Sequence, residues 1–175
     1  GRKRSDQHHM KMVVAPLASA PDEVVRRNEA HARTLGFPRL GRAERPRLAI
    51  VGGGPSIKER VEEISAFDGE IWAINGAWKW LNERGVEARF FSFDPSHEVL
   101  QFCVGARSAM LGLCCHPAVF ELLQDADIEA VHIGGEGMHN GPTTASCAPL
   151  VGIERGHEEI SFFGCESSYA ETTHV

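Results

Sequence analysis

Residues 48–57 read LAIVGGGPSI, and this stretch decides the fold. Four apolar residues predict a buried strand, three glycines predict a tight turn, and the proline and serine predict the start of a helix. Glycines in such a turn let the backbone approach a ligand without a Cβ in the way. The start of a helix offers unpaired amides and partial positive charge, which together favour an anion. The residues predicted to surround a phosphate are Gly52, Gly53, Gly54, Pro55 and Ser56.

This stretch differs from two well-known phosphate motifs. No Gly-Lys-Ser/Thr follows the glycines, so it is not a Walker A loop. Ile57 stands where the last glycine of a Gly-x-Gly-x-x-Gly fingerprint would be. A tight turn between strand and helix that binds no ligand is the alternative interpretation.

From residue 47 onward, short apolar runs alternate with segments of helical periodicity. The predicted strands are residues 48–51, 70–74, 88–93, 109–114, 130–133 and 159–163. The predicted helices are residues 57–66, 77–84, 96–104, 117–124 and 143–155, the last irregular because it contains Pro149 and Gly152. This alternation predicts an α/β fold: a Rossmann-like, open, mostly parallel sheet with helices on both faces.

The chain divides into two unequal parts. Residues 1–46 are expected to form an N-terminal arm with a polar helix over residues 22–35, lying on the surface or against a partner. Residues 47–175 are expected to form the Rossmann-like domain. The total of 175 residues suits one globular domain.

Charge and cysteine content exclude several classes of protein. The 18 Lys and Arg against 24 Asp and Glu give a formal charge of −6, which argues against binding of polymeric DNA or RNA. The five cysteines form no Cys-x-x-Cys pair, so we expect free thiols in a reducing, cytoplasmic setting. No apolar run approaches the ~18 residues of a membrane helix, so no membrane partner is expected.

Two further strands are followed by polar residues. Asn75 follows the strand predicted at residues 70–74, and Asp94 follows the strand predicted at 88–93. Ligands in open α/β sheets collect at the carboxyl ends of strands, where Asn75 suits a base or ribose and Asp94 suits Mg²⁺ or a ribose hydroxyl. Each residue is also a common turn former, which is the alternative.

Two later segments supply the remaining candidates. A glycine-rich loop over residues 134–142 contains His139 and leads to Thr143 and Thr144 at a helix start, an arrangement typical of a substrate loop. His132 lies within a predicted strand and is expected in the core. After the last strand, Glu166 stands where a catalytic or metal-binding carboxylate would, and His174 suits a general acid or base.

These motifs, in this order, resemble a known family. The Gly-Gly-Gly-Pro-Ser-Ile stretch is similar to the Gly-x-Gly-Pro-Ser-Leu signature of the 6-hydroxymethylpterin diphosphokinase MptE-like family. Asn75-Gly-Ala, Phe93-Asp94-Pro95, Gly164-Cys165-Glu166 and Thr173-His174 resemble its later blocks. The same signature occurs in motility-associated glycosyltransferases, and a related Gly-Asn-Gly-Pro-Ser in bacterial sialyltransferases. Gly53 stands where the sialyltransferase version has asparagine, and Glu166 where the family usually has aspartate.

The resemblance implies a nucleotide-dependent transferase. One activity would be Mg²⁺-dependent diphosphate transfer from ATP to a pterin alcohol, with Asp94 and Glu166 at the metal and His174 or His139 assisting proton transfer. The other would be glycosyl transfer from a CMP-type nucleotide sugar. A non-catalytic nucleotide-binding or assembly protein is a third interpretation. The expected partners are a small-molecule nucleotide and an acceptor, and a homo-oligomer is left open.

Overall fold

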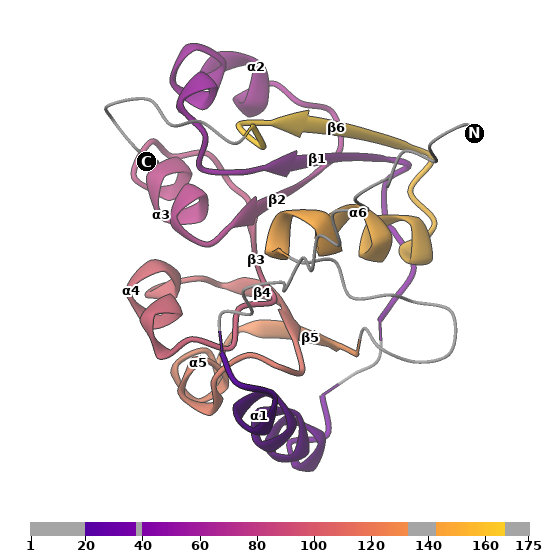
Figure 1. Cartoon of the computed structure of the whole chain (residues 1–175). Coiled ribbons are helices and arrows are strands. Elements are labelled where there is room, and N and C mark those ends of the chain that lie inside the picture. The colour runs from indigo at the N-terminus through magenta and orange to yellow at the C-terminus, as the bar shows by residue number, and fades with distance from the viewer. Residues whose placement is uncertain (1–19, 38–39, 133–142, 167–175) are drawn as a thin grey trace, which may run out of the picture.

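A computed structural model describes residues 20–37, 40–132 and 143–166 of the chain (Figure 1). Its strands are β1 (Arg47–Val51), β2 (Glu70–Ile74), β3 (Arg89–Ser92), β4 (Ser108–Gly112), β5 (Asp127–Val131) and β6 (Glu159–Phe163). They form one sheet in the order β5-β4-β3-β2-β1-β6, and every neighbouring pair is parallel. The Rossmann-like α/β fold predicted from the sequence is confirmed, with an all-parallel sheet.

In residues 20–37, 40–132 and 143–166, eight helical segments connect or flank the strands. They are α1 (Asp22–Thr34), η1 (Pro55–Glu59), α2 (Val61–Ser65), α3 (Gly76–Asn82), η2 (His97–Val99), α4 (Leu100–Cys103), α5 (Pro117–Leu122) and α6 (Thr144–Arg155), where η marks a 3₁₀ helix. In the described part of the chain, no helix is long and apolar enough to cross a membrane. All five cysteines are free thiols, as the sequence predicts.

Alternation along the strands builds a separate core on each face of the sheet. Ala49 and Val51 of β1 pack into a cluster with α2, α3, α4 and α5. Leu48 and Ile50 point the other way and pack with Val151 of α6. Helices therefore cover both faces, and among the described helices α6 alone lies on its side of the strands (Figure 1).

The strand order places a topological switch point between β1 and β6. The chain moves from β1 in one direction as far as β5, and α6 then returns it to the opposite side of β1. Because parallel crossovers are right-handed, the reversal of direction requires α6 to lie on the opposite face from α2–α5. In open α/β sheets, ligands bind outside the carboxyl ends of the strands at such a reversal.

The first helix packs into the same unit as the sheet. Asn28 of α1 is fully buried, and its Nδ2 donates to the carbonyl oxygens of Cys114 (2.9 Å) and Pro95 (3.4 Å). Ala32 is also buried, in the core cluster on the α5 side. Beyond the helix, the Phe37 ring stacks on Phe120 with centroids 5.3 Å apart. The helix expected at the surface or on a partner therefore covers part of this chain's own core.

A buried ion network joins α6 to the amino ends of the strands. The Arg155 side chain, only 4% exposed, donates to Glu129 Oε1 at 2.6 Å and to the Arg42 carbonyl oxygen at 3.2 Å. Arg89 of β3 also pairs with Glu129. Burial on its own would raise the pKa of Glu129, but the Gly41 amide and the two guanidiniums outweigh it, so the pKa is lowered. Glu129 is therefore an anion that ties together β3, β5, α6 and the segment before β1.

Several elements differ from the sequence-based expectation. The helices expected at residues 57–66 and 96–104 are each divided into a 3₁₀ helix and a short α-helix, and the strand expected at residues 109–114 lies at Ser108–Gly112. The strand expected at residues 130–133 lies at Asp127–Val131, because its first half carries the network residues Asp127 and Glu129 and has no apolar pattern. The helix expected to be irregular at Pro149 is continuous from Thr144 to Arg155. At Gly152 a Cβ would lie 2.8 Å from Leu48 Cδ2, so the glycine lets α6 pack closely on β1.

The buried His157 makes stability depend on pH. Burial lowers the pKa of His157, and the nearby positive charge of Arg155 lowers it further. The Glu70 carboxylate raises this pKa, but the net shift is downward. The unfolded chain therefore takes up a proton below about pH 6.5, while the folded protein does not. The contribution of the uncharged His157 to stability is full above that pH, and it is lost as the pH falls towards the lower pKa of the folded protein.

We predict that His157→Phe reduces this loss, because phenylalanine keeps a ring against Trp72, where the histidine centroid lies 5.4 Å away. The thermal midpoints of both proteins should be compared from about pH 7.5 to about pH 5.5. The wild-type midpoint should fall more than that of the variant. Equal falls would show that His157 does not contribute.

Candidate functional site

The loops after β1 and β6 interlock at the switch point. The Gly52 amide donates to the Phe163 carbonyl oxygen at 2.8 Å, and the Gly54 amide donates to the Gly164 carbonyl oxygen at 2.7 Å. A Cβ on Gly52 would lie 2.5 Å from the Gly164 oxygen, so only glycine fits there. These glycines therefore have a structural role, because they let two loops meet at the carboxyl ends of β1 and β6, where a ligand is expected.

The carboxylate of Glu166 lies at the start of η1. The Ser56 amide, just after Pro55, donates to Glu166 Oε1 at 2.9 Å. The sequence pattern predicted that this amide binds a ligand phosphate, and in the described structure it binds the protein's own carboxylate. The site therefore does bind an anionic oxygen, and residues 110 positions apart in the sequence form it. Gly53, between the interlocked glycines, also takes part in an interaction.

Asn75 occupies a strained turn at the end of the neighbouring strand β2. Its backbone has φ 45° and ψ −118°, the only positive φ at a non-glycine residue in the described chain. Such a conformation costs about 1–3 kcal/mol in a residue with a Cβ. Its side-chain Oδ1 is buried and has no hydrogen-bond partner among the described residues. Backbone strain and an unpaired buried oxygen, which both cost free energy, therefore coincide at the residue predicted to bind a base or ribose.

Asp94, Thr143 and Thr144 lie around the carboxyl end of β3. Asp94 Oδ1 accepts a hydrogen bond from the Ser96 amide at 2.9 Å, which makes a local turn. Thr143 caps α6 in a reciprocal pair with Ser146, and Thr144 Oγ1 accepts from the Phe93 amide at 3.3 Å. Both threonines thus position the start of α6 beside the Asp94 loop.

Asp94 and Glu166, the residues predicted at the magnesium ion, follow different strands. Asp94 follows β3 and Glu166 follows β6, and these two strands lie three spacings apart in the sheet, or roughly 14 Å. The Asp94 carboxylate accepts the Ser96 N–H of its own loop, and the Glu166 carboxylate accepts the Ser56 N–H from the loop after β1. Across residues 20–37, 40–132 and 143–166, no three His, Cys, Asp or Glu side chains are grouped to hold a metal. His139 and His174, the predicted proton-transfer residues, lie outside the described residues.

A second polar group lies beside the Asp94 loop, at the carboxyl ends of β3 and β4. The Cys114 thiol donates to the Phe93 carbonyl oxygen at 3.2 Å, and a hydrogen bond with Cys115 lowers the pKa of Cys114. His116 caps α5, and its ring meets His97 with centroids 4.9 Å apart. Adjacent cysteines followed by His-Pro were visible in the sequence, but only the neighbouring strands show that they face the Asp94 loop.

His132 also differs from its expected place in the core. It follows β5 and is exposed, with Nε2 4.0 Å from Glu29 Oε2. The true strand starts and ends earlier than the apolar pattern indicated, which leaves the histidine beyond the end of the strand.

Fold and site together define an open α/β protein with a polar, partly unsatisfied site at the switch point of its sheet. Comparison with known proteins adds no relative, since no family model, no curated protein and no solved structure matches this chain.

We predict that Asn75→Gly stabilises the protein. Glycine removes the strain of the positive φ and the buried Oδ1, and the greater freedom of the unfolded chain offsets about 0.4–1 kcal/mol of the gain. The free energy of unfolding in urea should rise by about 1 kcal/mol. Asn82→Gly, at an ordinary exposed helical position, should instead lower it. A loss of stability in Asn75→Gly would contradict the assignment of strain.

Proposed function

We propose that this chain is a nucleotide-dependent transferase that binds its donor at the switch point between β1 and β6. The observation that carries the proposal is Asn75. Its strained backbone and buried, unpaired Oδ1 stand beside an anion-binding loop. A ribose hydroxyl or a base amino group would donate to that oxygen. Binding would then offset a cost that is built into the fold.

The donor phosphates would lie over Gly52–Ser56. Two amides of this segment, at Gly52 and Gly54, are already bonded to the chain, whereas the Ser56 amide faces the Glu166 side chain. A phosphate oxygen is a chemical equivalent of that carboxylate oxygen. We therefore infer that Glu166 holds the place of the donor phosphate and moves aside when a nucleotide binds.

The resemblance to MptE-like enzymes supports diphosphate transfer from ATP to an alcohol. Mg²⁺ in such a reaction is bound by one or two carboxylates together with the donor phosphates, so a single carboxylate, Asp94 or Glu166, suffices on the protein side. The alternative is glycosyl transfer from a nucleotide sugar. That reaction requires one side chain that acts as general acid or base, and Asp94 at the end of β3 fits that role.

Glu166→Gln provides a sharp test of the donor site. Removing a negative charge at hydrogen-bond distance from the phosphate position should strengthen binding of ATP, CTP and CMP about five- to tenfold. Isothermal titration calorimetry of each nucleotide, with and without Mg²⁺, measures the change. Glu59→Gln removes one charge from η1 itself, at an exposed position, and should have little effect.

The outcomes separate the competing interpretations. Weaker binding in Glu166→Gln would make Glu166 a ligand of the donor or its metal. Absence of binding of all three nucleotides at millimolar concentration would refute the proposal. Nucleotide affinity without product, from ATP with an alcohol acceptor or from a CMP sugar, would favour a non-catalytic nucleotide-binding protein. Hydrolysis of a CMP sugar that Asp94→Asn abolishes, with affinity retained, would support glycosyl transfer.

A further inference from the structure

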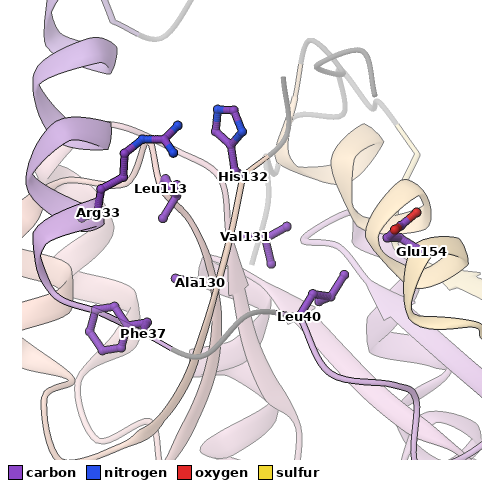
Figure 2. Close-up of a pocket in the computed structure, with 9 residues that line it drawn as sticks. Arg33, Phe37, Leu40, Leu113, Ala130, Val131, His132 and Glu154 are labelled. Atoms are coloured by element: carbon purple, nitrogen blue, oxygen red, sulfur yellow. The ribbon is translucent and has the colours of Figure 1, made fainter. Parts of the chain in front are cut away.

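A pocket of about 530 Å³ lies at the β5 edge of the sheet (Figure 2). It is separate from the switch point, because β5 and β1 are four strand spacings apart, or roughly 19 Å. Its walls come from α1, the segment after α1, the ends of β4 and β5, and α6. The apolar lining residues are Ala32, Phe37, Leu40, Leu113, Ala130 and Val131.

Several of these walls are fixed by packing elsewhere in the protein. Phe37 is held by stacking on Phe120, in the core cluster on the α5 side. Leu40 packs into the cluster on the α6 side, and the Gly41 amide that follows donates to Glu129 Oε2 at 2.9 Å. Phe37 and Leu40 are therefore anchored on opposite faces of the sheet. The space between these anchors is a built feature of the fold.

The polar groups of the pocket are unevenly placed. Arg33 of α1 and His132 after β5 extend at the same end of the pocket, while Phe37 and Leu40 lie at the other (Figure 2). Arg33 is exposed, and its guanidinium makes no ion pair or hydrogen bond with the described residues. Its guanidinium fork therefore remains able to bind a carboxylate or sulfonate in a bidentate manner. His132 already faces Glu29 at 4.0 Å.

The opposite wall limits the charge of the ligand. Glu154 of α6 lines the side of the pocket facing away from Arg33 (Figure 2). This carboxylate and Glu29 repel a ligand with several negative charges, such as a nucleoside triphosphate. A single negative charge at the Arg33 end avoids that repulsion. The volume also lies within the range of about 300–1,000 Å³ that is usual for small-molecule sites.

We propose that this pocket binds a small organic monoanion. The apolar body of the ligand lies against Phe37 and Leu113, and its carboxylate or sulfonate binds Arg33. The site is additional to the proposed nucleotide site, and its test does not depend on any transferase activity.

Two probes of matched shape test the proposal on the full chain. 1-Naphthoate carries the negative charge, and 1-naphthamide is its neutral counterpart. Titration followed by naphthalene fluorescence should show saturable one-site binding of 1-naphthoate, roughly tenfold tighter than that of 1-naphthamide, as expected for a hydrogen-bonded ion pair. Arg33→Gln should abolish the difference between the two probes.

Three controls make the result decisive. Arg26→Gln removes a positive charge from an exposed position of the same helix and should leave the preference for 1-naphthoate intact. Ala130→Leu narrows the pocket and should weaken both probes by a similar factor. Circular dichroism verifies that each variant is folded. Equal affinity for both probes, absence of saturable binding, or an unchanged preference in Arg33→Gln would overturn the proposal.

Discussion

The interlock between the loops after β1 and β6 is the constraint on which the candidate site depends. Gly164 has φ +60°, and a Cβ there would lie 2.0 Å from Ile57 Cγ2. A side chain at this position would therefore force apart the very loops that place Glu166 on the Ser56 amide. The pairing of β6 with all five residues of β1 supplies the rigid frame for this contact. The site exists because the last strand of the sheet returns to the first.

Local sequence patterns predicted most of the sheet for a physical reason. Strands buried on both faces need apolar residues at every position, and such runs stand out in the chain. The pattern failed at β5, an edge strand, where Asp127 and Glu129 serve the buried ion network. It failed again at α6, because Gly152 and Pro149 normally disrupt a helix. Gly152 is needed because α6 packs closely against Leu48 of β1. Such a contact between distant residues cannot be predicted from the neighbouring sequence.

The candidate site could be predicted only in pieces. The glycine loop, Asn75, Asp94 and Glu166 were each found from their positions after strands. Which of them share a site depends on strand order, which short-range patterns do not encode. The order β3-β2-β1-β6 separates Asp94 from Glu166 and brings Glu166 to Ser56. The two carboxylates predicted at the magnesium ion therefore follow different strands, β3 and β6.

Buried polar atoms without partners occur near both the amino and the carboxyl ends of the described strands. Their surroundings decide whether the cost of each unpaired atom is offset within the protein. Arg155 Nε and both nitrogens of His157 are unpaired, but they sit within the network of Glu70 and Glu129. Asn28 Oδ1 is unpaired, while the same amide donates to two carbonyl oxygens that hold α1 in place. In these cases, neighbouring contacts offset the cost of the orphan atom. Asn75 adds a strained backbone to its orphan oxygen, so its cost is the one that an external donor is best placed to offset.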